Sequence, residues 1–129
     1  MARVNQGAYK KYLDKFQKLE EAYKSVIAEA YEHNGDDEMF AGDSVTAWWF
    51  LDNADEIYRK MGKLKTKLDN MLETQKFESE NIKTKYEEKI NTLKSYRSDL
   101  KYRAKEIADL LGDDLSENER VTMESYKII

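Results

Sequence analysis

Apolar residues in the first thirty positions repeat with the spacing of a long amphipathic helix. They alternate steps of three and four residues through Tyr9, Tyr12, Phe16, Leu19, Tyr23 and Val26. This repeat is typical of helices that bury one face in a coiled coil or helical bundle. Further apolar side chains at Leu13, Ile27 and Tyr31 widen the stripe enough for burial on two sides. The pattern predicts a helix over about 8–33, ended near Gly35, and an acidic loop over 34–43.

Two further heptad-like stretches follow, and the pattern falters between them. The first passes through Ile57, Met61, Leu64 and Leu68, and the second through Ile82, Tyr86, Ile90, Leu93 and Leu100. One interpretation is an unbroken helix over about 44–111, which would be ~100 Å long and would need a partner chain. The other is a helical hairpin that turns near 74–81, with Ser79 or Asn81 as the cap. The absence of a turn glycine favours the long helix, whereas the need to shield the apolar stripes favours the hairpin.

The last twenty residues indicate a short separate helix. Gly112 ends the preceding pattern, and the Ser116-x-x-Glu119 capping box predicts a helix over about 116–127. The terminal Ile128 and Ile129 either pack against the bundle or form an exposed apolar end. The 129 residues suit one domain. We therefore predict a single all-α domain over 1–129, a coiled-coil-like bundle of two or three long amphipathic helices plus a short C-terminal helix.

Composition excludes several kinds of active site. The chain has no cysteine and one histidine, which excludes a thiolate metal site, a cysteine nucleophile and a histidine metal cluster. His33 with Asp36, Asp37 and Glu38 resembles metal ligands, but a histidine at a helix C-terminus beside a solvated acidic loop is the favoured interpretation. Phosphate-binding glycine motifs are absent. We expect no enzyme activity, no cofactor, no bound metal and no small-molecule substrate.

Nothing in the sequence indicates a membrane or secreted protein. No apolar run approaches the ~20 residues needed to cross a bilayer, and positions 1–11 lack the apolar core of a signal peptide. The expectation is a soluble, cytoplasmic protein that does not bind membranes.

Charge is divided unevenly along the chain. The net charge of -4 combines about -6 over 1–58, about +7 over 59–105 and about -5 over 106–129. The basic middle can therefore pair with the acidic flanks of its own chain or of a second copy. Lys60, Lys63 and Lys67 flank apolar heptad positions, which is where lysine stems cover a coiled-coil seam.

The aromatic run Trp48, Trp49 and Phe50 is the most unusual local feature. Neighbouring helical residues point about 100° apart, so the three side chains cannot all face one core. One interpretation is that they close the end of the bundle. The other is that they form, with Met39 and Phe40, a contact for a protein partner, because tryptophan is enriched at interface hot spots.

The function favoured by these patterns is that of a non-enzymatic helical protein–protein interaction module, of adaptor, scaffold, chaperone or inhibitor type. Self-association is expected through an assembly stripe, which comprises Tyr9, Tyr12, Phe16, Leu19, Tyr23, Leu64, Leu68, Ile82, Ile90, Leu93 and Leu100. The alternative is a nucleic-acid-binding accessory protein that uses the basic stretch 83–105. Its phosphate contacts would be Lys83, Lys85, Lys94, Arg97, Lys101 and Arg103, with tyrosines between them.

Overall fold

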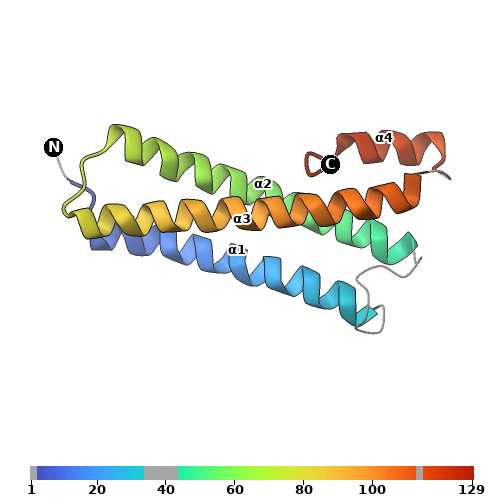
Figure 1. The fold of residues 1–129 in the computed structure, drawn as a ribbon, viewed down its shortest axis with the longest axis horizontal. Helices are drawn as coiled ribbons and strands as arrows, with labels where there is room; N and C mark the ends of the chain where they lie inside the picture. Colours follow the sequence, from blue (N-terminus) through green and yellow to red (C-terminus); the bar gives the residue numbers. More distant parts are fainter. Residues whose placement is uncertain (1–2, 34–43, 113–114) are drawn as a thin grey trace.

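Four helices make up the regular structure of the part of the chain that is described. The computed structural model describes residues 3–33, 44–112 and 115–129. The helices are α1 (Gln6–His33), α2 (Ser44–Thr74), α3 (Glu80–Leu111) and α4 (Glu117–Ser125). The three long helices lie side by side along the length of the molecule, and α4 lies beside the C-terminal half of α3 (Figure 1). This confirms the predicted all-α bundle with a short C-terminal helix.

The long helices run up, down and up. Tyr23 on α1 contacts Asp99 on α3, and Glu20 contacts Tyr96, so both pairs are separated by the same number of residues and the two helices are parallel. The intervening α2 runs in the opposite direction (Figure 1). None of the described helices is both long enough and apolar enough to cross a membrane.

A hairpin joins α2 to α3, so of the two interpretations of 44–111 the structure has the hairpin that turns near 74–81 and not the unbroken helix. The helix α2 ends at Thr74, and Ser79 caps α3 with an extended backbone while its side chain accepts a hydrogen bond from the Ile82 amide at 3.2 Å. An extended cap residue needs no positive φ, which explains how the chain turns without a glycine. The faltering of the heptad pattern between Leu72 and Ile82 marks this turn.

The N-terminal segment closes the turn, a role that heptad spacing does not reveal. The Val4 amide donates to the Lys76 carbonyl at 2.8 Å, and the Glu78 amide donates to the Val4 carbonyl at 2.8 Å. Val4 itself is buried, and the ring of Phe77 packs edge-on against Tyr86. The turn therefore has backbone partners from a segment more than seventy residues away, which satisfies polar groups that a two-helix hairpin would leave to solvent.

The heptad residues form the core of the bundle. Fully buried side chains include Met61 and Leu68 on α2 and Leu93, Leu100 and Ile107 on α3. Eight members of the predicted assembly stripe are buried inside this single chain: Tyr9, Phe16, Leu64, Leu68, Ile82, Ile90, Leu93 and Leu100. The other three, Tyr12, Leu19 and Tyr23, are half-buried against the same core. Most of the stripe is therefore used within the chain.

The C-terminal segment is hydrogen-bonded to α2 through the buried carboxylate of Asp55. The Ser116–Glu119 capping box is present, and α4 ends at Ser125 rather than near 127. Beyond it, Asp55 Oδ1 accepts the Lys127 and Ile128 amides at 2.8 and 3.0 Å, while Arg59 pairs with Asp55 Oδ2 at 2.8 Å. Of the two terminal isoleucines, Ile128 is fully buried and Ile129 is 41% exposed. Of the two alternatives for this end, packing against the bundle therefore applies to Ile128 and exposure to Ile129.

Tyr86 places a hydroxyl in the core without a hydrogen-bond partner among the described residues. Its side chain is 1% exposed, and rings of Tyr9, Tyr12 and Phe77 surround it at centroid distances of 5.5, 6.1 and 5.1 Å. Burial raises the pKa of Tyr86 to about 12, so the hydroxyl stays protonated at neutral pH. An unpaired buried hydroxyl lowers stability because it gives up its hydrogen bonds to water.

Replacing Tyr86 with phenylalanine should therefore stabilise the protein. We expect Y86F to increase the free energy of unfolding in urea by about 1 kcal/mol, because the ring contacts remain and the unpaired hydroxyl is removed. Y102F is the matched control, since Tyr102 is 64% exposed, and it should change stability by less than about 0.5 kcal/mol. A destabilised Y86F protein would show that the hydroxyl is hydrogen-bonded in solution.

Candidate interaction groove

The aromatic run is divided between the core and the C-terminal segment. Phe50 is fully buried. Its side chain therefore has no surface for a protein partner, and the prediction that it contacts one is wrong. Trp48 and Trp49 are half-buried and pack against the core, and the ring of Trp48 lies 6.5 Å from that of Tyr126. Met39 and Phe40 lie outside the described residues. The structure thus favours the interpretation that Phe50 closes the end of the bundle, and a partner contact at Trp48 and Trp49 stays a prediction.

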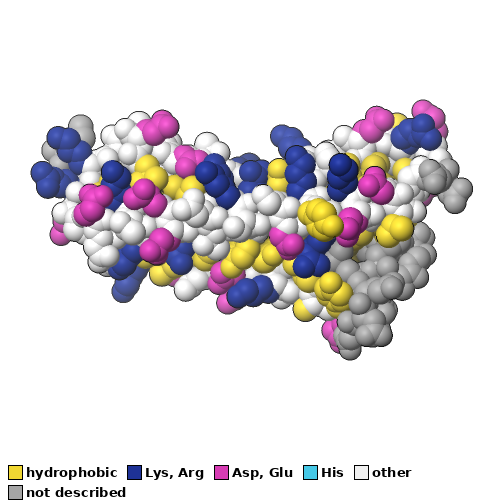
Figure 2. Space-filling view, in the orientation of Figure 1, with side chains coloured by type: hydrophobic (Ala, Val, Ile, Leu, Met, Phe, Trp, Pro, Cys, Tyr) yellow, Lys and Arg dark blue, Asp and Glu magenta, His cyan; other side chains and the backbone are white. Residues whose placement is uncertain are grey.

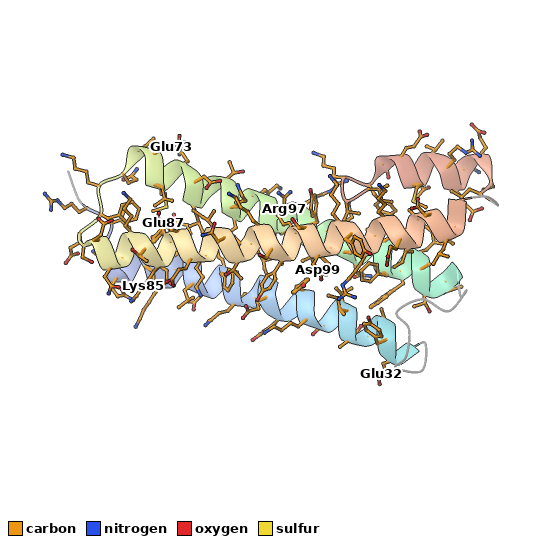
Figure 3. All side chains as sticks on the ribbon, viewed as in Figure 1. Glu32, Glu73, Lys85, Glu87, Arg97 and Asp99 are labelled. Atoms are coloured by element: carbon orange, nitrogen blue, oxygen red, sulfur yellow. The ribbon has the colours of Figure 1, made fainter. Side chains whose placement is uncertain are left out.

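The basic residues of α3 are directed toward different neighbours. The Arg97 guanidinium stacks 4.0 Å from the ring centroid of Tyr58 on α2, and its Nε donates to the Tyr58 carbonyl at 3.2 Å. Lys85 lies near Gln6 and over the Tyr9 ring of α1. Figure 3 shows Arg97 on the α2 side of α3, and Lys85 on the α1 side. The stretch 83–105 therefore does not present its cations as one stripe.

Three more of the predicted phosphate contacts remain partly or fully open to solvent. Lys94 and Lys101 are exposed and Lys83 is half-buried, whereas Arg103 pairs with Asp99 at 2.9 Å and donates to the Tyr31 hydroxyl at 3.4 Å. On the face shown in Figure 2, basic and acidic side chains are interspersed along the bundle. This arrangement weakens the basis for the nucleic-acid alternative, because steering of a phosphate backbone needs a surface of one sign.

Tyrosine–carboxylate hydrogen bonds close the seam between α1 and α3. The Tyr23 hydroxyl donates to Asp99 at 2.6 Å, the Tyr96 hydroxyl donates to Glu20 at 2.5 Å, and the two rings stack at 4.3 Å. The bond to Glu20, together with burial, raises the pKa of Tyr96 to about 12. Burial, followed by the bond to Asp99, also raises the pKa of Tyr23. Both hydroxyls therefore remain hydrogen-bond donors at neutral pH and hold α1 in register with α3.

The seam between α1 and α2 is open on one side and forms a groove of ≈ 690 Å³. From α1 it is lined by Tyr12, Lys15, Lys18, Leu19, Ala22 and Val26. From α2 it is lined by Asn53, Glu56, Ile57, Lys60, Lys63, Leu64 and Lys67. Each helix thus contributes a row with alternating three- and four-residue steps, which is the spacing with which a helix presents a seam to another helix.

The floor of this groove is mostly aliphatic. Val26, Ile57 and Leu64 are 4%, 9% and 7% exposed, and the half-buried Leu19 and Ala22 line the groove with them. The α1 side of the groove follows from the width of the first apolar stripe, which exceeds what contact with one neighbour requires. Periodicity does not show which part of that stripe remains uncovered, so the groove itself was not predicted.

Five lysines and one glutamate give the groove a positive charge. Lys60 pairs with Glu56 at 2.9 Å, and the Lys15 ammonium lies 5.8 Å from the centroid of the Tyr12 ring. Within the described part of the chain, Lys18, Lys63 and Lys67 make no ion pair. The predicted placement of Lys60, Lys63 and Lys67 beside an apolar seam agrees with the structure, and α1 adds two lysines on the opposite side.

Outside the groove, the described residues form no cluster of side chains suited to metal binding. No group of three histidine, cysteine, aspartate or glutamate side chains there could hold a metal ion. The sequence cluster of His33, Asp36, Asp37 and Glu38 lies outside the described side chains. The groove is therefore the feature of the described structure best suited to a functional contact.

Arg97 and Gly62 offer a test of whether the α3 cations serve the fold. A Cβ atom on Gly62 would approach Arg97 Nη2 to 2.7 Å, so G62A should displace the guanidinium from Tyr58. This loss opposes the gain of about 1 kcal/mol that alanine has over glycine in a helix. We expect G62A to raise the free energy of unfolding of the R97A protein by about 1 kcal/mol. In the parent protein the same substitution should give a value that is smaller by at least about 0.5 kcal/mol. Urea unfolding of the four proteins measures this difference, and equal effects of G62A in both backgrounds would contradict it.

No protein-family model, curated protein or solved structure matches this chain.

Proposed function

We propose that this chain is a non-enzymatic helical interaction module that binds a helix of another protein in the α1–α2 groove. The observation that carries the proposal is the groove itself, an aliphatic floor between two rows of heptad-spaced residues. A helix laid into such a groove buries its apolar face and extends the bundle, a common mode of peptide recognition. The protein would serve as an adaptor, scaffold, chaperone or inhibitor in the cytoplasm.

Burial of the assembly stripe favours a different protein over a second copy as the partner. Residues such as Leu68, Leu93 and Leu100 are already covered within one chain. Two copies that met through the groove would bring lysines against lysines, which is unfavourable at short distance. Self-association through the stripe, which is the mode that the sequence predicts, thus loses its main support, and the proposal assigns the contact to a different protein.

The proposal includes no catalytic step because Tyr23, Tyr96 and Asp55 use their polar atoms within the fold. The two tyrosine hydroxyls donate to carboxylates across the α1–α3 seam, and the buried Asp55 accepts two amides of the C-terminal segment. Each of these polar groups has a partner that explains its position. A catalytic site would instead bring such groups together in a pocket.

Filling the groove should block the proposed contact. Ala22 lines the groove and is half-buried, whereas Ala28 lies exposed on the same helix and does not line it. We expect A22Q to lower the affinity for a helix at least about fivefold, because the longer side chain occupies space that the helix needs, and A28Q to leave it unchanged. The probe is an 18-residue amphipathic peptide with a leucine face and uncharged glutamine flanks.

The measurement is titration of the ¹⁵N-labelled protein with this peptide by NMR. Shifted amides should cluster within 12–26 and 53–67, and circular dichroism should show both variants fully helical. Shifts concentrated elsewhere, or equal loss of affinity in A22Q and A28Q, would contradict the assignment of the groove.

A further inference from the structure

We infer that the helix received by the groove is acidic and about four turns long, an inference that rests on the proposed function. The lining rows run from Tyr12 to Val26 on α1 and from Asn53 to Lys67 on α2. Each row spans about 21 Å at 1.5 Å per residue. A helix of about fifteen residues therefore matches the groove from end to end.

Some of the lysines that line the groove would lose part of their water when a partner helix binds. An uncharged partner would leave their ammonium groups without a counter-ion. Lys15 and Lys67 stand within the two heptad-spaced rows, in line with Leu19 and Leu64, and neither makes an ion pair among the described residues. A helix that covers the floor removes water from these ammonium groups, and an unpaired cation in such a place is costly. Glutamate or aspartate side chains along the edges of the partner helix would pair with them.

Three lysines are available for such pairs. Lys18, Lys63 and Lys67 are exposed and make no ion pair among the described residues, while the carboxylate of Glu56 is already paired with Lys60. Charge complementarity therefore favours an acidic partner over a neutral or basic one.

The charge also has a direction along the groove. Because α1 and α2 are antiparallel (Figure 1), Tyr12 lies at the same end as Lys67, and Val26 lies at the same end as Asn53. All five lysines lie in the half of the groove between the Tyr12 end and Lys60. Glu56 lies nearer to the Val26 end. We expect the partner's carboxylates to be concentrated over the half that includes Tyr12.

Other anionic ligands fit the groove less well. Its floor is aliphatic apart from Tyr12, so it has no series of aromatic rings on which nucleic-acid bases could stack. The groove is open along one side, whereas a lipid chain is held best where most of its surface is enclosed. A helix with one apolar face and acidic edges matches both the floor and the lysines.

The test compares three 18-residue peptides that share one leucine face and carry glutamate, glutamine or lysine at the flanks. Isothermal titration calorimetry at low and physiological salt measures their affinities. We expect the glutamate peptide to bind about tenfold tighter than the glutamine peptide at low salt, and the lysine peptide to bind weakest. Salt should narrow these differences, because the lysines are exposed.

Reversal of the lysine charges gives the matched comparison. The variant K18E/K63E/K67E should lose at least about tenfold in affinity for the glutamate peptide and gain affinity for the lysine peptide. The control K24E/K94E/K101E changes the net charge equally at exposed lysines that do not line the groove, and it should retain the parental order. All six substitutions are at exposed positions, so circular dichroism should show unchanged helicity.

The outcomes separate this inference from the proposed function. Equal affinities of the glutamate and glutamine peptides, with groove amides shifted by both, would overturn the acidic partner and leave the interaction module standing. Failure of all three peptides to bind would overturn both. Tighter binding of a 20-nucleotide DNA strand, of oleate or of phosphatidylglycerol vesicles, lost in K18E/K63E/K67E, would assign the groove to that ligand and overturn the inference.

Discussion

The reversal of the chain between Thr74 and Glu80 is the constraint on which the rest of the structure depends. Because the chain turns there, the apolar stripes of α2 and α3 face each other rather than a second molecule. Ser79 caps α3, and the backbone of Val4 pairs with Lys76 and Glu78. The same residues would lie in the middle of an exposed helix of ~100 Å if the turn did not form. Burial of the heptad stripes within one chain follows from this reversal.

The three seams of the bundle are closed by different interactions, and one of them is closed incompletely. The α2–α3 seam is apolar and is bridged by Arg97 over Gly62 and Tyr58. Tyrosine–carboxylate hydrogen bonds and stacked rings hold α1 on α3. Between α1 and α2 the half-buried Leu19 and Ala22 line an open groove, and five lysines line the same groove. The proposed contact with a helix of another protein would bury further apolar area at this seam.

Heptad spacing and capping residues predicted most of the fold, because both act locally. The helix over 8–33, the Ser79 cap and the Ser116–Glu119 capping box all depend on residues a few positions apart. Local spacing leaves the choice between hairpin and long helix open, because the pairing of the Val4 backbone with Lys76 and Glu78 at the turn joins residues that are distant in sequence. The hydrogen bonds from the Lys127 and Ile128 amides to Asp55 likewise join residues that are distant in sequence, so local patterns do not predict them. For the groove, the sequence predicts that Lys60, Lys63 and Lys67 lie beside an apolar seam. Periodicity shows that a helix face is apolar, but it does not show whether another helix covers that face.

Size-exclusion chromatography with multi-angle light scattering tests most directly the claim that one chain buries its own apolar stripes. We expect a mass of 15.2 kDa that does not change over a wide range of protein concentration, with the elution volume of a short helical bundle. A stable dimer of twice that mass with the elution volume of an elongated rod would contradict this claim, because the stripes would then be shared between two long helices.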